Sequence, residues 1–127
     1  MITLKRAYVP ASEADGTRIL VERLWPRGLS KRELKVARWC KDAGPTTDLR
    51  KWFGHAPDKW SVFRRRYFRE LDRHPETWRP ILAAARRGRV TLVYSSRDVE
   101  HNNAVALEQY LRRMMRPRSK GRAAMRS

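Results

Sequence analysis

A carboxylate and an imidazole lie three positions apart in the stretch DVEHN, residues 98–102. On a helix this spacing brings Asp98 and His101 within one turn, where the pair can exchange protons as general acid and base. The same arrangement is common as a helix cap, in which Asp98 only accepts hydrogen bonds from backbone amides. Both roles are open from the sequence, and Ser95 and Ser96 are candidate nucleophiles by proximity alone.

A second polar stretch, RLWPRG (residues 23–28), follows the apolar run ILV. Arg23 and Arg27 offer bidentate donors for a phosphate or carboxylate group, and Trp25 offers an apolar wall. Gly28 lets a ligand approach the backbone closely. The alternative is a turn shaped by its proline and glycine, in which the tryptophan packs and the arginines are solvated. The stretch therefore predicts either an anion site or a structural turn.

The first of these stretches begins after a predicted strand, residues 90–94, and the second lies at the carboxyl end of another, residues 18–25. Ligands of open α/β sheets collect outside the carboxyl ends of the strands. If these strands are parallel neighbours, residues 25–28 and 95–98 share one crevice, and each precedes a predicted helix start that favours anions. The predicted ligand contacts are Arg23, Trp25, Arg27, Gly28, Ser95, Arg97 and Asn102. The predicted acid–base residues are Asp98 and His101, with Glu22 orienting a group or a water molecule.

The elements that must position these residues are predicted from apolar spacing and capping signals. A strand is expected over residues 2–9 and a loop over 10–17. The run Ile19–Val21 indicates burial on both faces of a strand. Ser30 and Glu33 form a capping box that predicts a helix over residues 31–42. A short helix is expected from the cap at residues 46–48 to Trp52, with Gly54 ending it.

The second half of the chain carries clearer helical stripes. A helix opening at Pro57 has Trp60, Phe63, Tyr67 and Leu71 on one face and arginines opposite, and ends at His74. Residues 76–87 predict a further helix, stopped by Gly88, and residues 95–98 begin a long helix that fades near residue 116. The aromatic residues among these arginines suit either a core or base stacking, and the helical spacing favours a core.

The element order predicts a single α/β domain with a small central sheet, parallel or mixed, covered by helices. Pairing of the first two strands as a hairpin stays open. The domain is expected over residues 1–115. Residues 116–127 form a basic tail without periodicity, which is expected to be mobile.

Composition bounds the class of protein. The 127 residues carry a net charge of +17, and residues 1–111 keep +10 of it once the seven basic residues from Arg112 onward are set aside. Such a charge attracts polyanions, although it equally serves solubility. No apolar run is long enough for a membrane span, and no secretion signal is evident, so a cytoplasmic location is expected. No cofactor is expected, and no metal, because the three histidines and Cys40 lack ligand spacing.

Three blocks of the sequence are similar to one known family: DGTRILVERLWPRGLSK (15–31), LRKWFGHAPDKWSVFRRRYFREL (49–71) and VTLVYSSRDVEHNNAVALEQYL (90–111). The chain resembles the YeaO-like bacterial proteins, domain of unknown function 488, over about residues 2–113. The resemblance implies a small cytoplasmic α/β domain and no particular reaction. Glu22 stands where the family commonly has Asp, Ala56 where Asp is usual, and Asn103 where His or Gln is common.

Three functions follow as hypotheses. The first is a binding module for a phosphate-bearing ligand, such as a nucleotide or nucleic acid, held by Arg23, Arg27 and Arg97. The second is an enzyme that acts on a phosphorylated or carboxylated small substrate through Asp98 and His101. The third is a non-catalytic interaction protein whose turn residues only maintain the fold. The sequence leaves the ligand and the oligomeric state open.

Overall fold

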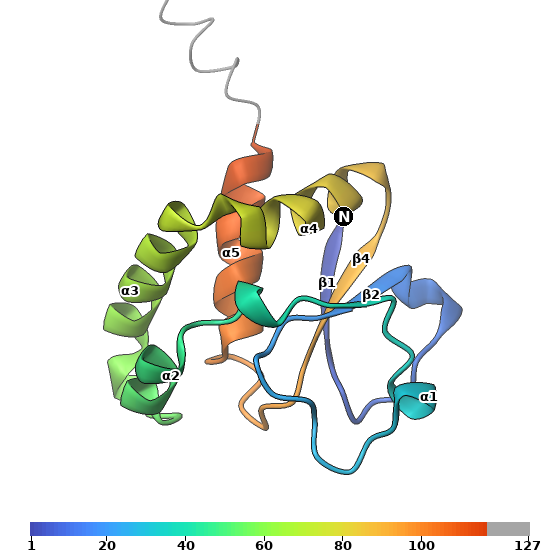
Figure 1. The fold of residues 1–127 in the computed structure, drawn as a ribbon, viewed down its shortest axis with the longest axis horizontal. Coiled ribbons are helices and arrows are strands. Elements are labelled where there is room, and N and C mark those ends of the chain that lie inside the picture. Colours follow the sequence, from blue (N-terminus) through green and yellow to red (C-terminus); the bar gives the residue numbers. More distant parts are fainter. Residues whose placement is uncertain (117–127) are drawn as a thin grey trace, which may run out of the picture.

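A parallel four-stranded sheet lies at the centre of the protein (Figure 1). The computed structural model describes residues 1–116. The strands are β1 (Ile2–Arg6), β2 (Thr17–Leu20), β3 (Arg38–Trp39) and β4 (Val90–Tyr94), in the order β1-β4-β2-β3. The predicted α/β class is confirmed, and of the two predicted sheet types the parallel one is present. A hairpin of the first two strands is excluded, because β4 lies between them.

Helices account for most of the remaining elements among the described residues. The predicted helices after residues 46, 57 and 75 are confirmed within a few residues, and Gly54 ends the first of them with a left-handed φ of 54°. Short 3-10 turns lie at Glu13–Asp15, Lys41–Ala43 and Pro57–Lys59. The α-helices are α1 (Lys31–Leu34), α2 (Thr47–Phe53), α3 (Trp60–Arg73), α4 (Pro75–Arg87) and α5 (Asn103–Met115).

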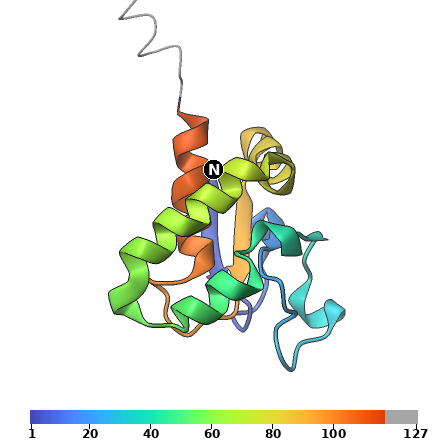
Figure 2. The same cartoon turned by 60° about the vertical axis from the view of Figure 1, so that its left-hand side comes forward.

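The two faces of the sheet are covered unequally. Alternate residues of β4, such as Leu92, face a large core made by α2 to α5. Val93, on the other face, packs with Leu20 and Leu34 in a small cluster under α1. Figures 1 and 2 show α1 apart from the other helices in both views. Burial on both faces at Ile19–Val21, predicted from the apolar run, is confirmed.

The helix predicted over residues 31–42 is wrong beyond its first turn. The capping box is present, since Ser30 Oγ accepts from the Glu33 amide at 3.1 Å and Glu33 accepts from the Ser30 amide at 2.9 Å. Lys35 then adopts a left-handed conformation with a φ of 51°. The guanidinium of Arg18 donates twice to the last helical carbonyl, that of Leu34, at 2.7 and 3.1 Å. These contacts end the helix, and the chain continues as β3 along the edge of β2.

Arg18 also belongs to a buried charge cluster that ties three elements together. Its guanidinium donates to Asp15 at 2.7 Å, and Lys5 of β1 donates to the same carboxylate at 2.9 Å. Burial alone would raise the pKa of Asp15. The hydrogen bonds from the Ser12 amide, Lys5 and Arg18 outweigh that effect and hold the pKa far below its ordinary value.

The other two corrections concern the segments that follow the strands. The strand predicted over residues 18–25 ends at Leu20, and the chain bends at Glu22–Leu24. The long helix predicted from residues 95–98 begins only at Asn103, with Asn102 as its cap. Residues 95–102 are therefore a loop. Both corrections leave more irregular chain at the carboxyl edge of the sheet than the sequence pattern predicts.

No helix among residues 1–116 is long and apolar enough to cross a membrane. The described chain ends one residue beyond α5, at Arg116. The basic tail expected over residues 116–127 therefore lies, after its first residue, outside the described part.

Candidate functional site

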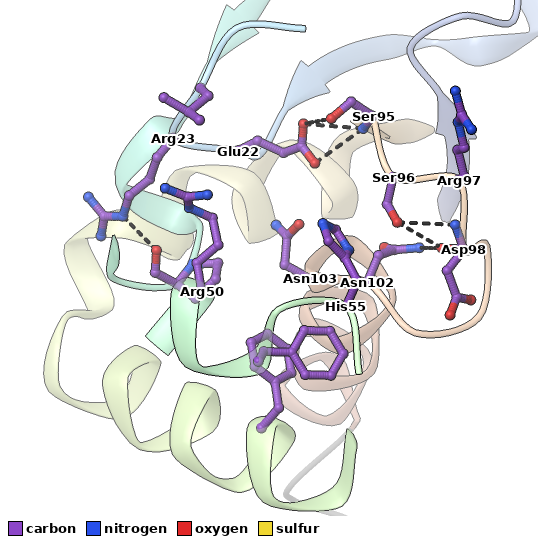
Figure 3. A pocket seen from close by; sticks show the side chains of 14 residues that line it. Glu22, Arg23, Arg50, His55, Ser95, Ser96, Arg97, Asp98, Asn102 and Asn103 are labelled. Carbon is purple, nitrogen blue, oxygen red and sulfur yellow. Dashed lines mark hydrogen bonds between the residues drawn. The ribbon is translucent and has the colours of Figure 1, made fainter. Parts of the chain in front are cut away.

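A cavity of about 590 Å³ opens at the carboxyl edge of the sheet, where β2 and β4 end side by side (Figure 3). Two loops form one side of it, residues 22–24 after β2 and residues 95–98 after β4. The start of α5 closes its end. The remaining wall comes from the segment around α2 and from α3, through Pro45, Arg50, Phe53, His55 and Phe63. A crevice is therefore present between the two strand ends, but residues 25–28, which were expected to share it, do not line it.

Six of the predicted site residues line this cavity: Glu22, Arg23, Ser95, Arg97, Asp98 and Asn102. The remaining four are not among its lining residues. One of these is His101, which packs against Trp60 in a T-shaped arrangement with the two ring centroids 5.4 Å apart. The structure thus brings together the residues that adjoin the strand ends, and leaves out those that lie further along RLWPRG.

Trp25, Arg27 and Gly28 are carried away from the cavity by the bend after β2. The indole of Trp25 packs on the small cluster under α1, and its Nε1 donates to the Leu29 carbonyl at 2.6 Å. Arg27 is exposed, and its carbonyl accepts from the Tyr8 hydroxyl at 2.9 Å. Gly28 has a φ of 82°, which glycine tolerates best. These three residues have the contacts expected of the structural-turn alternative, and they are not among the residues that line the cavity.

A carboxylate, that of Glu22, lines the cavity. Glu22 accepts hydrogen bonds from the Ser95 hydroxyl at 2.7 Å and from the Ser95 amide at 3.1 and 3.2 Å. Burial raises the pKa of Glu22 above its ordinary value, although the Ser95 donors and the nearby His55 and Arg50 act in the opposite direction. The side chain therefore combines a desolvated carboxylate with neighbouring donors, as ligand sites often do.

Arg23 braces the wall of the cavity. Its guanidinium donates to the Pro45 carbonyl at 2.6 Å and to the Gly44 carbonyl at 3.3 Å, and it pairs with Asp42 at 3.2 Å. The chain passes close here, because a Cβ built on Gly44 would lie 3.2 Å from the Val21 carbonyl oxygen. Most donors of Arg23 thus hold the segment before α2 against the end of β2, which limits what the residue can offer a ligand.

Arg50 on α2 is the contrasting arginine. Its side chain extends towards Glu22 and Arg23 in Figure 3. It is exposed and lines the cavity, and within residues 1–116 its guanidinium has neither a hydrogen bond nor an ion pair. Arg97 is also exposed and has neither a hydrogen bond nor an ion pair within residues 1–116, but its side chain extends away from Glu22 and Arg50 in Figure 3. Arg50 is therefore the guanidinium group that keeps its donors available on the side of Glu22.

Asp98 organises its own loop. One carboxylate oxygen accepts from the amides of Glu100 and His101, both at 2.9 Å, and the other lies 3.0 Å from His101 Nδ1. The amide hydrogen bonds of Glu100 and His101 lower the pKa of Asp98. Asn102 then caps α5 by accepting from the Val105 amide at 3.0 Å. Asp98 and His101 do meet, in an arrangement that shapes the loop leading to α5.

Sequence reasoning missed Arg50 and His55 as cavity residues. Both belong to the quoted block LRKWFGHAPDKW, where the aromatic spacing drew attention to the core. A signal was present at His55, which follows Gly54 between two helical segments and adopts a left-handed φ of 59°. Non-glycine residues in that conformation are uncommon and often mark functional sites.

The cavity combines polar walls with an apolar floor. Phe53 and Phe63 stack with their ring centroids 4.4 Å apart and supply that floor. Among residues 1–116, no three His, Cys, Asp or Glu side chains are grouped so as to hold a metal ion. The arrangement offers guanidinium donors, a carboxylate acceptor and aromatic carbon to one bound molecule.

The sequence of the chain matches one family of proteins. A family model described as the inactive DUF488-N3 subclade matches residues 1–127. The uncharacterised protein YeaO of Escherichia coli K12 is 40% identical over 111 residues, which cover 87% of this chain and 96% of YeaO. The uncharacterised protein Rv3073c of Mycobacterium tuberculosis H37Rv is 38% identical over 114 residues, covering 87% and 92%. No solved structure matches.

Proposed function

Because this chain belongs to the DUF488 family, in the subclade described as inactive DUF488-N3, we propose that it is a binding module whose cavity holds a small phosphate-bearing ligand. The cavity volume of about 590 Å³ falls within the range of small-molecule sites, roughly 300–1,000 Å³. A nucleotide or a smaller phosphate ester has the appropriate size.

The observation that carries the proposal is the available guanidinium of Arg50. A guanidinium offers parallel N–H donors that match two oxygens of one phosphate group. Arg50 extends towards Glu22 and Arg23 without a partner among the described residues, whereas Arg97 lies on the other wall with its side chain directed away from them. Arg23 adds positive charge, while its hydrogen bonds keep the wall in place.

The enzyme hypothesis is less well supported than binding. His101 lies outside the lining of the cavity, and the Asp98 oxygens are occupied by two backbone amides and the imidazole. The family description "inactive" also favours binding over turnover. A purely structural role of the loops, as in an interaction protein, would not account for Arg50, which lines the cavity without a partner within residues 1–116.

A nucleic acid is the second candidate partner, and it rests on charge outside the cavity. Exposed arginines follow the outer face of α3 at positions 65, 69 and 73, and none of them forms an ion pair within residues 1–116. Such a row suits contacts to a phosphate backbone, which carry no sequence preference. The cavity and the α3 face are separate surfaces, so the two proposals can be tested separately.

The direct test of the small-ligand proposal is a titration of 15N-labelled protein with inorganic phosphate and pyrophosphate, followed by NMR. We expect saturable shifts confined to residues 50–55 and 95–103. Arg50→Ala should weaken binding by at least about tenfold, as expected for loss of a charged hydrogen bond of roughly 1.5–3 kcal/mol. Arg65→Ala removes the same charge from α3 and should leave binding unchanged. Equal weakening by both variants, or no saturable shift, would contradict the proposal.

A further inference from the structure

Resting on the small-ligand function proposed above, we infer that the ligand is a phosphorylated sugar or polyol, whose hydroxyl groups bind Glu22 while its phosphate binds Arg50. The inference begins from a conflict inside the cavity. A site that binds an anion also has a carboxylate, that of Glu22, among its lining groups. A negatively charged group close to Glu22 would be repelled and would leave the carboxylate poorly solvated.

The conflict is resolved if the ligand has two different ends. Glu22 and Arg50 lie close enough that the guanidinium affects the carboxyl group electrostatically, yet no ion pair joins them. A phosphate on Arg50 can therefore be kept apart from a neutral, hydrogen-bonding portion on Glu22. Inorganic phosphate occupies only the position beside Arg50 and leaves the position beside Glu22 empty.

Glu22 retains acceptor capacity for that neutral portion. A carboxylate has about four lone-pair positions on its two oxygens. The Ser95 hydroxyl uses one of them on Oε1, and the Ser95 amide is shared between both oxygens at 3.2 and 3.1 Å. Glu22 also lines the cavity, so its remaining lone pairs are available to a ligand. Neighbouring hydroxyl groups of a sugar can donate to both oxygens of one carboxylate.

Hydroxyl groups fit this position better than an ammonium group. Burial raises the pKa of the Glu22 carboxyl group, and the nearby side chains of His55 and Arg50 already act electrostatically against that rise. A ligand cation at the same position would meet Arg50 as a like charge. The stacked rings of Phe53 and Phe63 offer carbon surface for the ligand skeleton. A hydroxylated carbon skeleton with one phosphate satisfies all of these contacts.

The test compares two probes that share a ring and a phosphate. Ribose 5-phosphate carries ring hydroxyl groups, and tetrahydrofurfuryl phosphate is the same framework without them. Calorimetry on the full chain should show ribose 5-phosphate binding at least tenfold more tightly. In Glu22→Gln that advantage should fall to threefold or less, with little change for tetrahydrofurfuryl phosphate. Asp58→Asn, which removes an exposed acid outside the cavity, should preserve the advantage.

The outcomes separate this inference from the proposed function. Equal affinity of the two probes for the unmodified protein would overturn the sugar inference and leave the phosphate site standing. Absence of binding by both probes, together with absence of phosphate binding, would remove the proposed function itself. If Glu22→Gln does not fold, the comparison of the two probes on the unmodified protein still decides.

Discussion

Glu22 accepts hydrogen bonds from both the hydroxyl and the amide of Ser95, although 73 positions separate the two residues in the chain. The contact joins the loop after β2 to the loop after β4. It therefore fixes the relative position of the two loops that form one side of the cavity. The position and the pKa of the Glu22 carboxyl group should consequently depend on Ser95.

We expect the Glu22 carboxyl group to titrate above its ordinary pKa of 4.5, because burial disfavours its charged form. Between 4.5 and the raised value, the folded protein holds a proton that the unfolded chain has released. The free energy of unfolding contributed by this group should therefore fall as the pH rises through that window. The NMR titration of the Glu22 side-chain carboxyl carbon measures its midpoint.

Ser95→Ala should raise the Glu22 pKa further, because it removes the hydroxyl donor that favours the carboxylate. Ser96→Ala is the matched control, since the Ser96 hydroxyl bonds to the Asp98 backbone and not to Glu22. A midpoint of 4.5 or below in the unmodified protein, or equal effects of the two serine variants, would contradict this assignment.

Asp98→Ala should lower the melting temperature at pH 7, because two backbone amides and the His101 ring lose their acceptor. The pKa of Asp98 is lowered in the folded protein, so its stabilising effect is present above the ordinary value of 3.8. That effect is lost as the pH falls through the lowered pKa. Thermal melts of both proteins at pH 7 and pH 3 should show a smaller difference at the lower pH.

Glu100→Ala serves as the control for Asp98→Ala, because the exposed Glu100 side chain makes no hydrogen bond within the described residues. It should leave the melting temperature unchanged. An Asp98→Ala protein that melts like the unmodified one at pH 7 would show that the carboxylate does not stabilise the loop.

Asp15→Asn should destabilise the fold by about 1–3 kcal/mol at pH 7, because it leaves the buried Arg18 guanidinium without its counter-charge. The folded pKa of Asp15 is strongly lowered, so the stabilisation is complete above the ordinary value of 3.8 and declines progressively at lower pH. Urea unfolding at pH 7 and pH 3 measures both effects.

Glu13→Gln provides the comparison for Asp15→Asn. Glu13 lies in the same 3-10 turn and is exposed, and its side chain forms no hydrogen bond or ion pair with Arg18 or Lys5. Its free energy of unfolding should be unchanged. Equal free energies for the two variants would show that the buried cluster contributes no net stability.

Nucleic-acid binding by the α3 face predicts an affinity that falls steeply between low and moderate salt. Fluorescence anisotropy with a labelled single-stranded oligonucleotide measures the slope. The double variant Arg65→Ala with Arg69→Ala should reduce that slope by about 1.4, since each phosphate contact to a single strand contributes roughly 0.7. Lys31→Ala, on α1, should leave it unchanged. An affinity that does not depend on salt would exclude this partner.

Local signals in the sequence were enough to predict much of the fold. The apolar run Ile19–Val21 and the helical stripe of Trp60 to Leu71 are strong because burial itself imposes those patterns. The shared crevice followed from the parallel arrangement of two strands. Predicting these features requires only the residues within each element, together with the rule that ligands of open α/β sheets bind at the carboxyl ends of the strands.

The errors arose where distant residues compete with local preference. Ser30 begins a helix as predicted, but the guanidinium of Arg18, on β2, binds the last carbonyl of that helix. The chain then pairs with β2 as β3. Arg50 was not predicted as a site residue, because what distinguishes it is visible only in the fold. It lines the cavity, and its guanidinium has no partner within residues 1–116. Neither a distant partner nor a missing one has a signature in local sequence.

The position of β4 at the centre of the sheet has a consequence for how the protein is made. β1 and β2 each pair with β4, and neither pairs with the other. The strand that joins them is synthesised some seventy residues after β2, so the sheet needs long loops to close before it is stable. A nascent chain shorter than about 90 residues has no β4 and therefore lacks one side of the cavity. Ligand binding should therefore report completed synthesis, and a ribosome-bound fragment ending before Val90 should not bind ligand.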